Sequence, residues 1–311
     1  NENKYQEAYI YATKVIADGH YPLASDYREI FLADNNTCKE IIWPLVQDGL
    51  RAQSSAGTNF YVKAFVNGPM DELYKTGVGS RGWGNVRAKV SLVDAFDADD
   101  VMFDGNDTWG NNKKDKRAQF MTALPNQVKD TWDVNMDMTS TFTCGYGYIK
   151  WRNVTKEDEL SASGDAYTSI DFPLFRTADA YLMAAEAILR GASGTKSEAL
   201  GYVNEVRTRA YMSGKYAKNG VRSDVSGEIG ANELDLDFLL LERQKELASE
   251  LIRRTDLIRF GKYTKGNNWD WKNGVRLGED VDDKYNLFPI PESELTNNPT
   301  LVQNDGYKVI K

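Results

Sequence analysis

One stretch, residues 235–261, constrains the fold of this chain more than any other. It reads DLDFLLLERQKELASELIRRTDLIRFG, with apolar residues at helical spacing. Charged pairs three or four positions apart occupy the other faces, and each such pair stabilises a helix by only about 0.2–0.5 kcal/mol. We therefore expect one long surface helix that ends at Gly261, a residue suited to a left-handed stop. The predicted core-facing stripe comprises Phe238, Leu240, Leu241, Leu247, Ala248 and Leu251.

Length and charge limit the class of protein. The 311 residues are enough for a sizeable core in one large or two ordinary domains. A net charge of −8 argues against nucleic acid or an anionic membrane surface as the partner. No run of about 18 apolar residues is present, so no membrane span is predicted. Aromatic residues make up 12% of the chain, and flat rings with polar edges suit amphipathic ligands.

The cysteines and the first residues bear on the chain's setting. Cys38 and Cys144 have neither CxxC nor zinc spacing, so we expect free thiols, with a disulfide as the less favoured alternative. No signal peptide is visible. The chain starts inside an amphipathic helix predicted for residues 4–18, which is typical of a part of a longer protein.

The rest of the chain alternates between helical and loop-rich segments. Residues 40–46 (EIIWPLV) favour a strand, and 144–153 is the best strand candidate in the loop-rich region. Residues 172–191 and 197–212 are predicted to form two helices, an Ala-rich antiparallel hairpin typical of a tetratricopeptide unit. The Pro- and Asn-rich tail, 286–307, is expected to be extended and to wrap over the surface.

No nucleophile–base set can be assembled from the sequence. Residues 77–82 match GxGxxG, but no buried strand precedes them, so they are interpreted as a loop. The single histidine, His20, lies in a helix-ending turn, which leaves no Ser-His-Asp arrangement. The acidic residues between Asp94 and Asp107 fail the EF-hand spacing and are interpreted as a solvated loop, with weak calcium binding as the less favoured alternative. Paired carboxylates for glycoside hydrolysis stay open, because sequence does not reveal their separation.

Aromatic residues in polar loops offer a different chemistry. Tyr74, Trp83 and Trp109 lie in segments rich in Gly, Asn and Asp. Exposed rings stack on the C–H faces of a pyranose, and nearby fork or amide groups bind its hydroxyls. Core rings beneath long loops are the alternative, and both interpretations stay open. The polar candidates are Arg81, Asn85 and Arg87; Trp132, Trp151, Trp269 and Trp271 are interpreted as structural.

The order of charges in the first stretch is specific. ERQKELASELIRRTDLIRFG resembles a C-terminal pattern of the SusD/RagB family. It departs at Leu251, where that family usually has Gly, at Ile252, often His, and at Arg254, often aromatic. FRTADAYLMAAEAILRG, YVNEVRTRAY and LFPIPESELTNNPTLVQNDGY match further family segments in the family's order, so the resemblance covers nearly all of the chain. The matching positions are Glu242-Arg243, Glu246-Leu247-Ala248, Glu250, Arg253, Asp256-Leu257, Arg259 and Gly261.

The resemblance implies a mainly α fold, in which tetratricopeptide-type hairpins support a loop-rich ligand-binding face with a few short strands. The chain would be the C-terminal portion of a single SusD-like domain. Residues 1–20 and 172–265 would form the helical scaffold, 40–171 the ligand-face excursion and 286–311 the wrapping tail. Family members usually begin with a lipidated Cys and several helices, which would precede the part seen here.

The resemblance also implies a function. Such a protein binds a glycan, starch-like or another oligosaccharide, without catalysis, and delivers it to a SusC-like TonB-dependent transporter. It is lipid-anchored at the outer membrane. The implied ligand-binding residues are Trp83, Tyr74, Arg81, Asn85 and Arg87, and some starch-binding relatives hold a structural calcium, for which Asp48 is the candidate ligand. A glycoside hydrolase with paired carboxylates and a helical-repeat adaptor are the alternatives.

Overall fold

The structure is a computed structural model, and it describes residues 2–51, 53–66, 71–72, 74–101, 112–121, 145–212 and 225–308. The chain divides into two compact units, Asn1–Leu251 and Ile252–Lys311. The described residues are mostly helical with short strands, as the family resemblance implied. Among them, no helix combines the length and the apolar character that crossing a bilayer requires.

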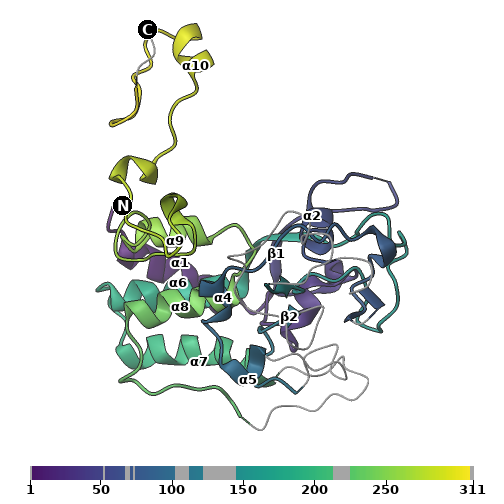
Figure 1. Cartoon of the computed structure of the whole chain (residues 1–311). Coiled ribbons are helices and arrows are strands. Elements are labelled where there is room, and N and C mark those ends of the chain that lie inside the picture. Colours follow the sequence, from purple (N-terminus) through teal and green to yellow (C-terminus); the bar gives the residue numbers. More distant parts are fainter. Residues whose placement is uncertain are drawn as a thin grey trace. The chain divides into compact units, whose positions relative to one another are not determined.

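The helical part of the first unit is organised around α6 (Thr177–Leu189), which packs against α1 (Tyr5–Asp18), α7 (Lys196–Met212) and α8 (Leu236–Glu246) (Figure 1). Alanines on α6 and valines on α7 meet in a shared core, where small side chains allow close approach. This confirms the predicted Ala-rich hairpin.

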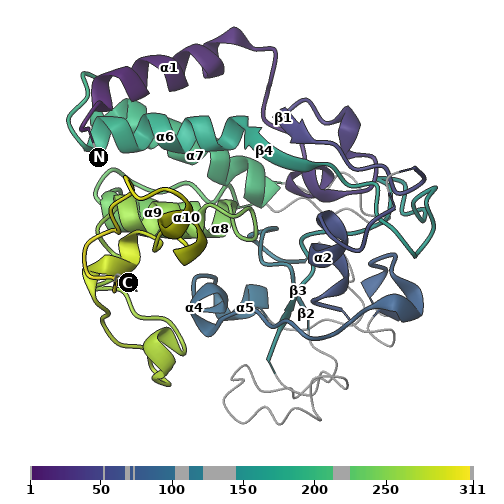
Figure 2. The ribbon, with the colours of Figure 1, turned by 90° about the horizontal axis from the view of Figure 1, so that it is seen from above.

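Strand β4 (Phe172–Arg176) runs directly into α6, and β1 (Ile41–Leu45) lies antiparallel beside it (Figure 2). The prediction of β1 is confirmed. The prediction that the helix begins at residue 172 is wrong. Pro173 pushes the residue before it toward an extended backbone, and β1 supplies the hydrogen-bonding partner. Within the described part of the 144–153 candidate, residues 145–153, only β3 (Gly147–Tyr148) is a strand, and it pairs with β2 (Phe120–Met121).

A second core lies beneath the loop-rich part of the first unit. Trp151 is 1% exposed, stacks parallel to Phe172 at 5.5 Å and meets Phe31 edge-on at 4.9 Å. Its interpretation as structural is therefore confirmed. Short helices surround this core: η1 (Tyr27–Phe31), η2 (Asn35–Thr37), α2 (Thr58–Lys63), η3 (Gly79–Arg81), α4 (Val90–Val93) and α5 (Ala98–Val101).

The stretch 235–261 is not one helix. It forms α8 and α9 (Arg253–Arg259), and the intervening Ser249 and Leu251 have left-handed φ values of 61° and 64°. The predicted stripe is also wrong in part, because Leu251 is 76% exposed while Glu246 is fully buried. The reason is tertiary: basic side chains from distant segments converge on the acidic residues of α8 and its C-terminal end.

Glu246 is the centre of this buried charge network. One of its carboxylate oxygens accepts from Arg176 at 2.6 Å and from Arg209, and the other accepts from Arg117 at 3.2 Å. The network joins α8 to α7, to β4 and to the segment before β2. Its further members are Glu40, Asp115, Lys150, Arg207, Glu242 and Glu250, all with side chains at most 9% exposed.

Proton affinities in the network reflect burial and neighbouring charge. Burial alone raises the pKa of Glu246, but the charges of Arg209, Arg176 and Arg117 outweigh it and hold that pKa far below its usual value. Burial lowers the pKa of Lys150 to about 8, although Glu250, at 2.5 Å, favours the charged ammonium. Burial also raises the pKa of the free thiol of Cys38 to about 12; Cys144 lies outside the described residues.

The second unit holds short elements and the tail. The Arg254 guanidinium lies over the rings of Phe288, at 4.2 Å, and Tyr263, at 4.9 Å. Trp269 packs on Tyr263 at 5.6 Å, whereas Trp271 is 49% exposed, so the structural interpretation suits Trp269 better. The remaining elements are η5 (Lys272–Gly274), η6 (Asp283–Asn286) and α10 (Glu292–Asn297), the last within a tail predicted to be extended.

We expect Glu246→Gln to lower the free energy of unfolding by about 3–5 kcal/mol, because it leaves buried guanidinium groups short of a negative partner. Glu205→Gln, at an exposed position of α7, is the control and should change the free energy of unfolding by less than about 0.5 kcal/mol. Urea unfolding measures both. A loss below about 1 kcal/mol for Glu246→Gln would contradict a dominant role of this carboxylate.

We also expect stability to fall in acid through the same residue. Its pKa is lower in the folded than in the unfolded chain, where it is about 4.3, so its contribution is complete above that pH and declines as the pH falls further. The difference in urea midpoint between the wild type and Glu246→Gln should therefore shrink between pH 6 and pH 3, which are about one to two units on either side of the unfolded pKa. A constant difference would contradict this linkage.

Candidate functional site

The loop at residues 82–87 is fixed to the end of α2 by main-chain hydrogen bonds. Trp83 N donates to Lys63 O at 2.8 Å, and Gly84 N donates to Val66 O at 2.7 Å. Asn85 N donates to Ala64 O at 3.0 Å. Because three consecutive backbone N–H groups of the loop are hydrogen-bonded, the loop has few alternative conformations. The backbone N–H groups around Trp83 are thus bonded to carbonyl groups at the end of α2 and just after it.

An exposed aromatic pair results. The rings of Trp83 and Phe60 lie edge to face, with centroids 6.2 Å apart, and the two residues are 40% and 44% exposed. Tyr61 flanks Phe60 at 5.8 Å and reaches inward to Trp151 at 5.3 Å. The pair is therefore connected through ring contacts to the core beneath it. We call Trp83 and Phe60 the aromatic platform.

Charged groups border the platform. Arg81 Nε donates to Asp165 Oδ1 at 3.0 Å, and both side chains are partly exposed. The Lys63 ammonium donates to Ala166 O and lies 5.9 Å from the centre of the Tyr167 ring. Burial lowers the pKa of Lys63, and the charge of Arg81 acts in the same direction. Stacking surfaces and hydrogen-bonding groups therefore occur together here.

The glycines before the platform have a structural role. The Asp71 carboxylate accepts from Val78 N at 3.1 Å and Gly79 N at 2.9 Å, which fixes the turn. Gly77 has φ +79°, and a Cβ there would lie 2.5 Å from Asn153 O. Only glycine fits this close approach. The interpretation of residues 77–82 as a loop, not a dinucleotide site, agrees with this geometry.

The structure separates the predicted site residues. Trp83 and Arg81 are exposed and two residues apart in the chain, and Asn85 is exposed in the same loop. Tyr74 is 4% exposed and packs within the hydrophobic core, so the expectation that it presents a ring to ligand is wrong. Arg87 is half-buried, and its Nη1 donates to Gly84 O and Val86 O, which braces the loop. Trp109 lies outside the described residues.

Sequence reasoning missed Phe60, Lys63 and Asp165. Phe60 and Lys63 belong to α2, a six-residue helix that is too short to show a clear apolar periodicity in the sequence. Asp165 is far away in the sequence and meets Arg81 only through the fold. The GTNFYVK segment, with two adjacent aromatics after a glycine in a polar region, was the one local signal for Phe60.

Asp48 has local partners. Its Oδ1 accepts from Leu50 N at 2.9 Å and Arg51 N at 3.2 Å, and its Oδ2 lies 3.8 Å from Arg51 Nε. Among the described residues, no group of three or more His, Cys, Asp or Glu side chains is placed to hold a metal ion. The structure therefore adds no further ligand to Asp48, and calcium binding there stays a prediction.

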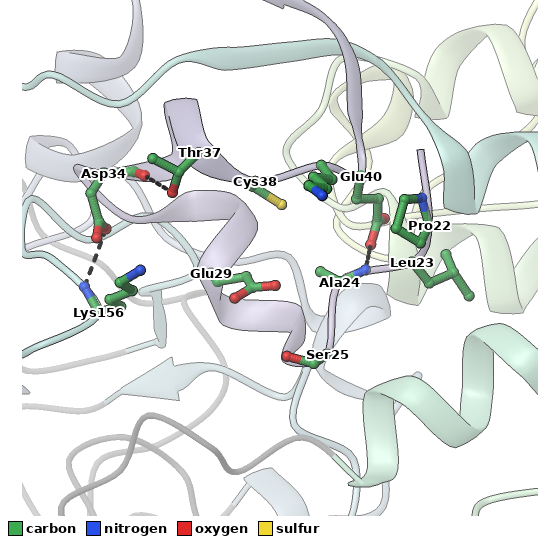
Figure 3. Close-up of a pocket in the computed structure, with 11 residues that line it drawn as sticks. Pro22, Leu23, Ala24, Ser25, Glu29, Asp34, Thr37, Cys38, Glu40 and Lys156 are labelled. Carbon is green, nitrogen blue, oxygen red and sulfur yellow. Dashed lines mark hydrogen bonds between the residues drawn. The ribbon is translucent and has the colours of Figure 1, made fainter. Parts of the chain in front are cut away.

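A separate pocket of about 340 Å³ lies between η1, η2 and the loop at Lys156 (Figure 3). Its lining includes Cys38, Glu40 and Lys156, and no aromatic residue. Glu40 Oε2 accepts from Ala24 N at 2.8 Å, and Asp34 Oδ1 accepts from Lys156 N at 3.1 Å, as Figure 3 shows. Because these carboxylates bind the protein itself and no ring is present for stacking, the aromatic platform is the better candidate site.

Sequence comparisons give consistent matches. The model of the SusD family matches residues 39–307. The starch-binding protein SusD of Bacteroides thetaiotaomicron is 32% identical over 337 aligned residues, which cover 99% of this chain and 57% of that protein. SusD-like protein P25 of Formosa agariphila is 25% identical, with 98% of this chain and 55% of that protein covered. The chain thus spans little more than half the length of these relatives.

Solved structures show the same fold. A SusD-like protein from Bacteroides fragilis aligns with a TM-score of 0.65 and 21% identity, over 98% of this chain and 62% of that one. Surface glycan-binding protein A from Bacteroides thetaiotaomicron, in complex with laminarihexaose, aligns with a TM-score of 0.59 and 21% identity, over 97% of this chain and 59% of that one.

Proposed function

Because the chain belongs to the SusD family, we propose that it is part of a non-catalytic protein that binds a glycan at the cell surface. The observation that carries this proposal is the aromatic platform, Trp83 and Phe60, exposed and bordered by the Arg81–Asp165 ion pair. The family match and the platform are independent, since the platform follows from contacts within this chain alone.

The platform suits a sugar for physical reasons. A pyranose presents an apolar C–H face that packs on an aromatic ring and a rim of hydroxyls that need hydrogen-bonding partners. Trp83 and Phe60 supply the rings. Arg81 supplies planar donors and Asp165 supplies acceptors, already held at 3.0 Å from each other, so a ligand orders little that is not ordered before binding.

The relatives support the choice of ligand class. One is named a starch-binding protein, and a structural neighbour contains laminarihexaose, so we take α- and β-linked glucans as the first probes. Delivery to a SusC-like TonB-dependent transporter and a lipid anchor at the outer membrane complete the proposal. A structural calcium bound by Asp48 is the remaining element of the proposal.

Catalysis by paired carboxylates is the alternative. A glycoside hydrolase places two carboxyl groups on opposite sides of the bond to be cleaved, one acting as an acid. Beside the platform, Asp165 is engaged by Arg81, which favours a role in holding the ligand. His20 is the single histidine of the sequence, and its Nδ1 lies 2.8 Å from Oδ2 of the exposed Asp18 at the end of α1.

We expect Trp83→Ala to weaken glucan binding by about 1–3 kcal/mol, because it removes a stacking ring and its buried area. Phe60→Ala should weaken it in the same direction. Calorimetric titration of the whole protein with maltoheptaose and laminarihexaose measures both. Trp271→Ala, a half-exposed tryptophan in the second unit, is the matched control. Unchanged affinity in Trp83→Ala and Phe60→Ala would remove the platform from the site.

We further expect no reducing ends to appear when the protein is incubated with either glucan. A reducing-sugar assay over several hours, with a glucanase as positive control, measures this. Release of reducing ends that Asp165→Asn abolishes would establish the hydrolase alternative instead. If neither glucan binds nor is cleaved, the helical-repeat adaptor becomes the favoured hypothesis.

A further inference from the structure

The guanidinium group of Arg81 is only partly engaged by the protein. Its Nε donates to Asp165 Oδ1 at 3.0 Å, and the Arg81 side chain is 56% exposed. Within the ranges that the structure describes, neither Nη1 nor Nη2 of Arg81 donates a hydrogen bond to the protein. Two of its three nitrogens therefore remain available, two residues before Trp83 in the same loop.

Buried arginines of the same unit are used differently. In Arg176, Nε, Nη1 and Nη2 each donate to an acceptor of the buried charge network. In Arg117, the three nitrogens donate to Asp115 and Glu242. Such full pairing is what a buried guanidinium needs, because unpaired donors are costly inside a protein. Arg81 has one nitrogen that fixes its orientation and two that form a fork open to a ligand.

The fold holds the partner of this fork in place. Gly79 has φ +54°, and a Cβ there would lie 2.9 Å from Asp165 Oδ2, so the carboxylate occupies space that only glycine leaves free. The neighbouring Ala166 O accepts from the Lys63 ammonium, which ties the Asp165 loop to α2. Asp165 is therefore a positioning residue, which aims the Arg81 guanidinium before any ligand arrives.

Positive charge predominates around the fork, although the whole chain carries a net charge of −8. The segments that build the site are 58–63, 78–87 and 161–169, and their charged side chains are Lys63, Arg81, Arg87 and Asp165. Asp71 adds one carboxylate, which accepts from Val78 N and Gly79 N. Burial lowers the pKa of Lys63, and the positive charge of Arg81 lowers it further. A negative group on the ligand would relieve this repulsion.

We propose that the aromatic platform takes a glycan that bears an anionic group, the carboxylate of a uronate or a sulfate ester, and that Nη1 and Nη2 of Arg81 bind this group. Either anion presents two oxygens that match the two parallel N–H groups of the fork. The sugar ring packs on Trp83, and the Lys63 ammonium adds attraction. A hydroxyl offers a single oxygen and no charge. The inference rests on the proposed sugar site and names the class of sugar that the site prefers.

Matched ligands isolate the charge from the linkage. Maltoheptaose and laminarihexaose are each compared with the same oligosaccharide oxidised at C6 to uronates and with the form sulfated at C6, by calorimetric titration of the whole protein. At about 0.05 M NaCl, we expect at least one anionic form to bind at least about tenfold more tightly than its neutral parent. At about 0.5 M NaCl, this advantage should fall at least about threefold because the charges are screened. The two anionic arms show whether the fork accepts carboxylate, sulfate or both.

Variants link the preference to the fork. Arg81→Gln should bring the affinities of the anionic and neutral forms to within about twofold of each other, because the charge and the paired donors are both lost. Arg81→Lys keeps the charge without the planar fork, so it should restore less than about half of the lost preference. Arg276→Gln removes the same charge at an exposed position of the second unit and should leave the preference unchanged. Melting temperatures show that each variant is folded.

The outcomes separate this inference from the proposed function. A neutral parent that binds as tightly as both of its anionic forms would overturn the anionic preference and leave the sugar site intact. A preference that survives Arg81→Gln would overturn the role of the fork, and full restoration by Arg81→Lys would overturn the two-point contact. Absence of binding by every ligand would overturn the proposed function and the anionic preference together.

Discussion

The first unit depends on the buried charge network around Glu246. This carboxylate accepts from Arg176 in β4, Arg209 in α7 and Arg117 before β2, so three distant segments meet at one residue of α8. Removing such charges from water is costly, and the cost is offset only when each group finds its partners. The arrangement therefore stabilises one relative placement of these segments and penalises others. Its position at the end of α8 also explains why the helix stops there: Glu250 turns back toward Arg176 and Lys150.

The network bears on the site through β4. Arg176 ends that strand and is held by Glu40, Glu246 and Glu250, and the ladder to β1 follows from there. Loops between β1 and β4 then carry α2 and the aromatic platform, where main-chain hydrogen bonds between residues 63–66 and 83–86 hold Trp83 in place. A platform held in this way loses little conformational freedom on binding.

The comparison of sequence and structure is clearest at individual residues. Periodicity predicted α1 and α7. The β-propensity of residues 40–46 predicted β1, although Trp43 and Leu45 of that strand are exposed. Periodicity failed at Leu251, which is exposed, and at Glu246, which is buried, since burial of a charge depends on partners far away in the sequence. At the site, composition indicated Trp83 and Arg81. It could not separate them from Tyr74, whose surroundings are equally polar in sequence and apolar in space.

By itself, the sequence determined the family, through the order of its motifs, and the helical hairpin, through the spacing of its alanines. It also determined that a sugar-type chemistry was available, through aromatic residues set among Arg, Asn and Asp. Only the tertiary structure decided which rings are exposed, because Phe60 and Trp83 meet where a loop is hydrogen-bonded to the end of a helix. It likewise decided that Arg81 pairs with Asp165, which is distant in the sequence. It also decided which charges of the stretch 235–261 lie inside, namely Glu242, Arg243, Glu246, Glu250 and Asp256. The physical reason is common to both: exposure and ion pairing depend on what covers a side chain, and that is supplied by residues remote in the sequence.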